Sequence, residues 1–386
     1  MSNTILRVSL KVGIIAGIIG GVSNIPFNVM PVILGSAADQ YSLIPSEIGT
    51  LASLTLFGWV LGTVICFFIA RKIDWRWLSG AGFLIAAASV QLSLFSDSTS
   101  LLYFAWFILG FGCSVPTCIV FEVLSHTQNQ ERSFGMLSLI VVIVSAIVLY
   151  TIPAYILPYW QYAGMVHSFS LLMLCAMSLV WVFPSNSPSQ SVASKDSDNS
   201  ANSSAWIALA AVLIFFAGQS GLWAFLERAG REIDLSPKDI GIVLSLLKLV
   251  GGLAGVAVMV IATRFGNRWP YVASLLGIMF GVYLLDSANS LEMYALGSWI
   301  WEFFFALVFC YSAAAVSRLD KTGRIVVLVP GAAFTGAAIG PLIAGYLKTG
   351  PGFMPIYIFA VICTLICAVI FLTLLSKQPI KEQVTV

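Results

Sequence analysis

The chain has 386 residues, of which 59% are hydrophobic, 13% aromatic and only 9% charged, and its formal net charge is +2. This small number of charged side chains cannot cover the surface of a soluble globular protein of this length. The composition therefore excludes a soluble protein. We interpret the sequence as that of a protein that crosses a lipid bilayer several times.

Hydrophobic runs of about 18 to 25 residues recur along the whole chain, and each is long enough to cross a hydrocarbon core as a helix. The alternating pattern of a membrane β-barrel is absent, so we predict an all-α membrane protein with twelve transmembrane helices. In chain order, the predicted spans cover residues 11–34, 47–70, 77–95, 101–124, 134–153, 163–183, 205–227, 238–262, 270–286, 291–316, 325–347 and 353–375.

The first predicted span is bent and carries two amides. Pro26 and Pro31 interrupt its hydrophobic run, and Asn24 and Asn28 lie about one helical turn apart. Because no small-residue cleavage site follows this run, we interpret it as a retained span and not as a signal peptide.

A polar stretch, PSNSPSQSVASKDSDNSANSS, separates the sixth and seventh predicted spans at residues 184–204. This composition, which has no apolar periodicity, is typical of a flexible hydrophilic linker. We therefore divide the chain into an N-terminal six-helix bundle, residues 1–183, and a C-terminal six-helix bundle, residues 205–386.

The distribution of lysine and arginine predicts the orientation in the membrane. Of the 19 basic residues, Arg228, Arg231, Lys238 and Lys348 lie on one side of the predicted spans and Lys248 lies inside a span, while the remainder gather on the other side. The positive-inside rule makes the richer side cytoplasmic. We therefore expect both termini and the linker in the cytoplasm, and a multi-pass protein of the plasma membrane, here a bacterial inner membrane.

The two predicted bundles resemble each other in sequence. LIPSEIGTLASL at 43–54 and LSPKDIGIVLSL at 235–246 share six residues at a constant offset of 192 residues, and IARKIDWRW at 69–77 matches IATRFGNRW at 261–269 at the same offset. One register kept across a span and both of its flanking loops indicates an internal repeat. Parallel six-helix repeats are an architecture of secondary transporters.

These two loops and the full-length two-bundle organisation resemble the major facilitator superfamily, whose loop between the second and third spans combines glycine, aspartate and arginine. The resemblance implies two pseudo-symmetric bundles that rock about a central site. It also implies that charged residues of these loops form a conformational gate, here Arg71, Lys72, Asp74, Arg76, Arg264 and Arg268. We expect Glu122 and Arg132, at the ends of the fourth and fifth spans, to join this gate through ion pairs.

Lys248 lies about ten residues into the eighth predicted span, near the bilayer centre, where a charge costs roughly 2.5 to 3.5 kcal/mol. Small residues such as Gly241 and Gly251 share its helix face, so we expect the lysine to point into the protein. Glu302 lies at matching depth on the tenth span, and we predict an ion pair between the two. This pair is either a static structural pair or one that opens to couple transport to protons.

Glu227, at the far end of the seventh span, is a further candidate proton-coupling residue. The competing interpretation is a solvated helix end, because Glu227 with Arg231 and Arg228 with Glu232 have the i,i+4 spacing of surface ion pairs.

The family resemblance places the first, fourth, seventh and tenth spans around a central cavity. The predicted substrate-binding residues on these spans are Asn24, Asn28, Gln219, Trp223, Trp299 and Glu302, and Lys248 of the eighth span is predicted to join them. For the amides the alternative is helix-to-helix hydrogen bonding, and for the tryptophans it is packing.

Together these features predict a secondary active transporter that moves a small organic solute, anionic or amphipathic, by alternating access with proton coupling. Proton-driven efflux of drug-like or cationic amphipathic compounds and an uncoupled uniporter are the alternatives. No HExxH or GxSxG motif points to an enzyme. The seven cysteines fall inside predicted spans, so we expect neither a metal site nor a cofactor. The expected partners are the solute, protons and lipid, without nucleic acid, and we expect a monomer.

Overall fold

The computed structural model describes residues 10–70, 72–125, 130–183, 203–265, 268–320, 325 and 328–376. Within these ranges every regular element is a helix, which agrees with the predicted all-α class. The elements are α1 (Leu10–Ser23), α2 (Ile25–Asn28), α3 (Met30–Tyr41), α4 (Pro45–Ile69), α5 (Trp75–Leu92), η1 (Ser93–Phe95), α6 (Thr99–Ser125), α7 (Gln130–Thr151), η2 (Ile152–Ile156), α8 (Leu157–Leu179), η3 (Val180–Val182), α9 (Ser203–Glu232), α10 (Pro237–Phe265), α11 (Arg268–Asp286), α12 (Leu291–Leu319), α13 (Val329–Leu347) and α14 (Met354–Ser376).

Each predicted span overlaps at least one of these helices. Among the described residues, eight helical stretches are long and apolar enough to cross a membrane by themselves. The molecule is therefore a multi-pass membrane protein, and the count of twelve crossings stays a prediction.

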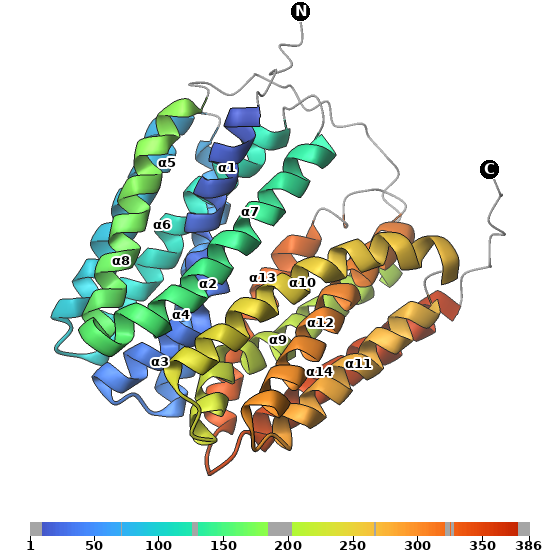
Figure 1. Ribbon diagram of the computed structural model, residues 1–386. Coiled ribbons are helices and arrows are strands. Elements are labelled where there is room, and N and C mark those ends of the chain that lie inside the picture. The colour runs from blue at the N-terminus through green and yellow to red at the C-terminus, as the bar shows by residue number, and fades with distance from the viewer. Residues whose placement is uncertain are drawn as a thin grey trace, which may run out of the picture.

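The helices form two groups that lie side by side (Figure 1). The first group holds α1 to α8, in blue to green, and the second group holds α9 to α14, in yellow to red. We call the end where α4 and α6 finish and α9 and α13 begin the open end, and the end where α3 finishes and α10 begins the closed end. The predicted linker falls largely on residues outside the described ranges, so the domain boundaries stay predictions.

The first predicted span is longer and more broken than expected. Pro26 and Pro31 stand near the starts of α2 and α3, where the missing amide hydrogen of proline costs no helical bond. The helix continues past the predicted end at residue 34 as far as Tyr41 and stops at Ser42, whose φ of 52° is left-handed. This extension corrects the prediction and brings Asp39 onto a helix that faces the second group.

The fifth and sixth predicted spans are joined without an extended loop. Residues 132–182 are helical except at Gln161, whose φ of 49° and ψ of −146° mark a kink between two helical segments inside α8. The short π-helical element η2 precedes this point.

The two groups touch most closely at the closed end, where glycines let backbones meet. A Cβ atom on Gly49 of α4 would lie 2.2 Å from the carbonyl oxygen of Pro341 on α13, and one on Gly345 would lie 2.5 Å from that of Pro45. On the other side of the molecule, a Cβ on Gly241 of α10 would lie 2.8 Å from the carbonyl oxygen of Leu149 on α7. Only glycine allows these separations, so the closed end depends on it.

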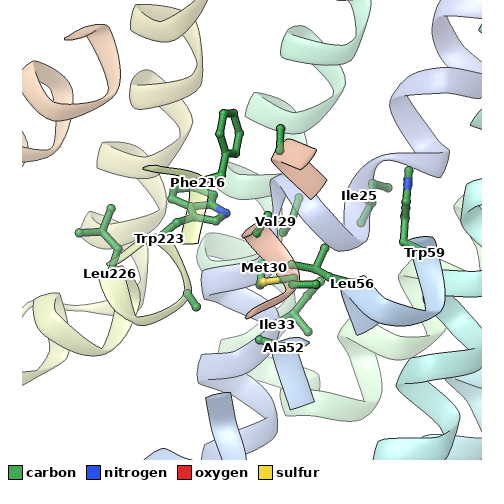
Figure 2. Close-up of a cluster of buried hydrophobic side chains, with 14 of the residues drawn as sticks. Ile25, Val29, Met30, Ile33, Ala52, Leu56, Trp59, Phe216, Trp223 and Leu226 are labelled. Atoms are coloured by element: carbon green, nitrogen blue, oxygen red, sulfur yellow. The ribbon is translucent and has the colours of Figure 1, made fainter. Parts of the chain in front are cut away.

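A cluster of buried apolar side chains crosses the contact between the groups (Figure 2). It combines Ile25, Val29, Met30 and Ile33 from the first span, Ala52, Leu56 and Trp59 from α4, and Phe216, Trp223 and Leu226 from α9. These residues are at most 8% exposed, so they form a closely packed apolar contact between the two groups.

Candidate functional site

A cavity of about 900 Å³ lies between the two groups on the side of the open end. Its walls come from the junction of α1 and α2 and from α4, α6 and α7 in the first group, and from α9 and α13 in the second group. The polar residues that line it are Asn24, Thr63, Thr117, Glu122, Ser125 and Thr335, and most of the others are aromatic or aliphatic. A cavity of this size and character accepts a small organic molecule.

Aromatic rings from both groups close the inner part of this cavity. Trp59 of α4 stacks on Phe334 of α13 with ring centroids 6.2 Å apart and an interplanar angle of 14°. Phe27 of α2 meets the same phenylalanine edge-on at 5.6 Å. A solute that reaches this point contacts residues of both groups at once.

Asn24 lies on the cavity wall and also bonds to a neighbouring helix. Its Nδ2 donates to the carbonyl of Gly20 at 2.8 Å and to Thr117 Oγ1 on α6 at 3.4 Å. Ser23 Oγ lies 2.8 Å from the same hydroxyl. The amide therefore fits both predicted roles. Asn28, half-buried at the end of α2, does not line the cavity.

The predicted gate residues spread over the open end. Glu122 lines the cavity. Asp74 instead caps α5, its Oδ1 accepting from the backbone amide of Arg76 at 2.8 Å, and the Arg76 side chain donates through Nε to the carbonyl of Phe183 at 2.5 Å. Both contacts stay within the first group.

The remaining predicted gate residues are either exposed or outside the described residues. Lys72 and Arg132 are exposed near the open end. The predicted gate residue Arg71 and the side chains of Arg264 and Arg268 lie outside the described residues. The assignment of these residues to a gate stays a prediction.

Lys248 and Glu302 are brought together, as expected from their matching depth. Lys248 Nζ lies 3.5 Å from Glu302 Oε1, and Glu302 is 7% exposed. A Cβ atom on Gly251 would lie 2.8 Å from the same carboxylate oxygen, so the glycine makes room for it. The ammonium also lies 4.0 Å from the centroid of the Trp223 ring. Neither charged residue is among those that line the cavity.

Gln219 is buried at 1% exposure inside the second group. Its Nε2 donates to Thr364 Oγ1 at 2.9 Å, and its Oε1 accepts from the indole of Trp301 at 2.7 Å. Trp299 donates in the same way to the carbonyl of Val243 on α10 at 3.0 Å. These contacts are the interhelical bonds of the alternative interpretation, and a role in substrate binding stays a prediction.

Trp223 differs from these residues because its bond crosses between the groups. Its Nε1 donates to the carbonyl oxygen of Phe27 on α2 at 3.1 Å. The indole also stacks on Trp301 at 6.4 Å. Trp223 therefore joins the ion pair on α10 and α12 to the broken first span.

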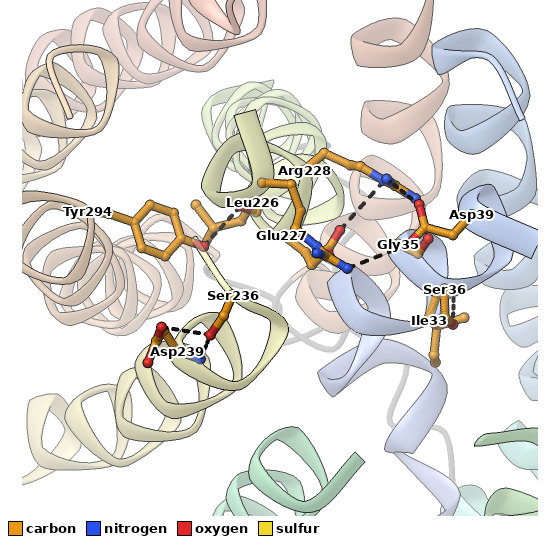
Figure 3. A network of polar contacts seen from close by, with 11 residues as sticks. Ile33, Gly35, Ser36, Asp39, Leu226, Glu227, Arg228, Ser236, Asp239 and Tyr294 are labelled. Atoms are coloured by element: carbon orange, nitrogen blue, oxygen red, sulfur yellow. Dashed lines mark hydrogen bonds and ion pairs between the residues drawn. The ribbon is translucent and has the colours of Figure 1, made fainter. Parts of the chain in front are cut away.

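A charged network ties the groups together at the closed end (Figure 3). Arg228 Nη1 on α9 lies 2.8 Å from Asp39 Oδ1 on α3, and the second amino group of this arginine donates to the carbonyl of Gly35. Arg231 Nη2 lies 3.6 Å from Asp39 Oδ2, and its Nε donates to Glu227 Oε1 at 3.1 Å. We call these five residues the closed-end network.

This network changes two expectations from the sequence. Glu227 is 7% exposed, so it does not lie on a solvated helix end. The expected pair of Arg228 with Glu232 is replaced, because Arg228 turns to Asp39 and Glu232 Oε2 lies 3.3 Å from Lys348 Nζ. Sequence reasoning missed Asp39, since the predicted first span ended before it and no local spacing connects it to α9.

Comparison with known proteins agrees with the family resemblance of the sequence. Residues 207–385 match the model of the Major Facilitator Superfamily. No curated protein matches the sequence.

Solved structures match over nearly the full length. A variant of the nucleoside transporter NupG superimposes with a TM-score of 0.78 at 13% identity, covering 94% of this chain and 99% of that one. A bacterial homologue of the human lysosomal transporter Spinster superimposes in its inward-facing and occupied conformation with a TM-score of 0.71 at 12% identity, covering 95% and 97%. At these identities the likeness shows a shared fold.

Proposed function

We propose that this chain is a membrane transporter of the major facilitator superfamily, whose model matches residues 207–385, and that it carries a small organic solute by alternating access. The observation that carries this proposal is the single-sided cavity: its walls come from both groups, it lies toward one end, and charged and apolar contacts join the groups at the other. A solute held there reaches the opposite side when the groups rock about it.

The lining supports an amphipathic solute. Aromatic and aliphatic side chains dominate it, a few hydroxyls and the Asn24 amide offer hydrogen bonds, and no lysine or arginine is among the described residues that line it. The one basic residue predicted to bind an anion, Lys248, is engaged by Glu302 outside the cavity. We therefore favour a neutral or cationic amphipathic solute over a simple organic anion. A nucleoside is such a solute and belongs among the first probes, since NupG is named a nucleoside transporter.

We further propose that the open end faces the cytoplasm of a bacterial inner membrane, on the strength of the basic residues near that end. The cavity in this structure then faces inward.

Proton coupling through Lys248 and Glu302 is part of the proposal. The pair is buried, and a buried carboxylate that gains a proton leaves its lysine partner unpaired, which changes the free energy of the conformation that holds it. An uncoupled uniporter is the second candidate function, favoured by the location of the pair outside the cavity.

The test has two stages. First, thermal unfolding of the purified protein is followed with uridine, an aromatic carboxylate and an aromatic quaternary ammonium compound. A ligand that binds only the folded state raises the melting temperature by mass action. The compound with the clearest shift then serves as the flux probe, and a panel without any shift or flux contradicts the proposed function.

Second, proteoliposomes carrying the protein are given an imposed difference of one pH unit. Coupling to one proton per neutral solute supports about a tenfold solute gradient, since a factor of ten equals about 1.4 kcal/mol. We expect Glu302→Gln and Lys248→Ala to lose this gradient and still exchange labelled for unlabelled solute. Glu232→Gln, the same chemical change at a pair on the closed end, is the control that retains it. Full accumulation in both variants rejects coupling by the pair, and a wild type that only equilibrates the solute establishes the uniporter.

A further inference from the structure

The backbone carbonyl of Phe27 lacks its usual helical hydrogen-bond donor, and the sequence explains why. In a helix this carbonyl would accept from the amide of residue 31, which is Pro31 and carries no hydrogen. The indole Nε1 of Trp223 supplies the missing donor at 3.1 Å, from a helix 196 positions away. The bond therefore replaces a helical one and links α9 to the break in the first span.

The two residues of this hydrogen bond contact different parts of the molecule: Phe27 contacts the cavity wall and Trp223 contacts the ion pair. On one side, the Phe27 ring meets Phe334, which stacks on Trp59 at the inner end of the cavity. On the other side, the ammonium of Lys248 lies 4.0 Å from the centroid of the Trp223 ring, over which it is placed. A continuous series of contacts thus runs from the ion pair to the cavity.

The physical connection lies in the indole itself. A cation over the face of an aromatic ring is attracted to it and withdraws electron density, which strengthens the ring N–H as a donor. Glu302 holds the ammonium in place at 3.5 Å. When Glu302 loses its charge, the ammonium has no carboxylate to hold it over the ring, and the bond to Phe27 weakens.

Among the described residues, few other charged or polar groups lie close enough to Glu302 to replace Lys248 as its partner. Lys248 from α10 is the charged side chain that faces Glu302 there. Nearby, α11 presents glycines to α12, with Gly281 against the backbone of Trp301. The neighbouring groups of α9 and α14 are the neutral Gln219 and Thr364.

We infer that Trp223 is the positioning residue through which the Lys248–Glu302 pair controls the contact between the two groups: with the pair intact, the indole bond to Phe27 holds the closed end shut. The inference rests on the proposed function, because it names the link between the coupling pair and the alternation of access. Trp223 acts through Phe27 and does not itself line the cavity.

The test is amide hydrogen exchange of the full-length protein in nanodiscs, without solute or pH gradient, read on peptides from α3 and from the start of α10. Trp223→Phe keeps the ring beneath the ammonium and removes only the N–H donor. We expect it to raise exchange at the closed end by roughly fivefold, the effect of one typical hydrogen bond on a two-state population. Trp106→Phe is the matched control, because its indole donates to Tyr162 within the first group at 3.1 Å.

A double-mutant comparison tests the link to the ion pair. Glu302→Gln should also raise closed-end exchange, and the double variant with Trp223→Phe should not exceed Trp223→Phe alone, because the two changes act on one bond. Lys248→Met, which removes the cation and leaves the indole, should behave as Glu302→Gln does and replaces Trp223→Phe if that variant does not fold.

Two results overturn the inference: closed-end exchange in Trp223→Phe that equals that of Trp106→Phe, or single effects that multiply in the double variant. Because the measurement needs no solute, it is independent of the flux assay. Absent flux with a non-multiplying pair of effects rejects the transport proposal and keeps the link, while coupled flux with multiplying effects does the reverse.

Discussion

Gln219 illustrates how a single buried amide is decided by its neighbours. Its side chain satisfies the indole N–H of Trp301 and donates to Thr364, all within the second group. Sequence alone could not separate this role from solute binding, because both need an amide on the inner face of a span. The burial of 1% and the complete use of the oxygen and nitrogen favour an internal role.

Replacement of Gln219 by leucine is expected to lower the stability of the folded protein by about 1–3 kcal/mol, since it leaves the Trp301 N–H buried without an acceptor. The melting temperature of the purified variant measures this. Gln91→Leu is the control, because Gln91 bonds to His167 and Ser170 at a half-exposed position where water can substitute. A variant that melts as the wild type does but has a raised KM for the transported solute contradicts the internal role.

Individual helices are positioned by pairs of small residues that the internal repeat places at equivalent positions. Gly49 in α4 and Gly241 in α10 are separated by the repeat offset of 192 residues. Both lie where a helix of one group crosses the other group, Gly49 against Pro341 and Gly241 against Leu149. The repeat therefore preserves a close backbone approach, whereas Lys248, whose equivalent is Leu56, has no counterpart in the first group.

At this scale we predict that Gly49→Ala weakens the crossing of α4 and α13. The added methyl group would meet a backbone carbonyl at 2.2 Å, which cannot rotate away as a side chain can. Forced separation of well-packed elements costs about 1–3 kcal/mol. Thermal unfolding together with amide exchange in α3 measures the effect. For Gly255→Ala in α10, where a Cβ would meet nothing within 4 Å, we expect no loss, and an equal loss there would reject the steric argument.

The whole molecule adopts a conformation closed at one end because charged and apolar contacts both join the groups there. The closed-end network joins α3 to α9 through Asp39, Arg228 and Arg231, and the apolar cluster lies between it and the cavity. Asp39 is the first group's carboxylate in this network, and its side chain is 53% exposed. Such a pair contributes little to folding stability but acts directly on the contact that must break for access to alternate.

Asp39→Asn is accordingly expected to change stability by less than about 1 kcal/mol and yet to raise amide exchange at the start of α10. Asp97→Asn, an exposed change within the first group, is the control. A large fall in melting temperature would show that Asp39 supports the fold itself, and unchanged exchange would show that the network does not hold the closed end.

Composition and hydrophobic run length determined the class, the all-α structure and the approximate place of each span, because these depend on local properties of a helix in lipid. Depth along the helix was enough to pair Lys248 with Glu302, since opposite buried charges at one level have few other partners. Tertiary structure alone decided the location of the cavity, the partner of Arg228 and the bond from Trp223 to Phe27. These depend on how helices far apart in the chain cross, and neither periodicity nor charge spacing encodes that crossing.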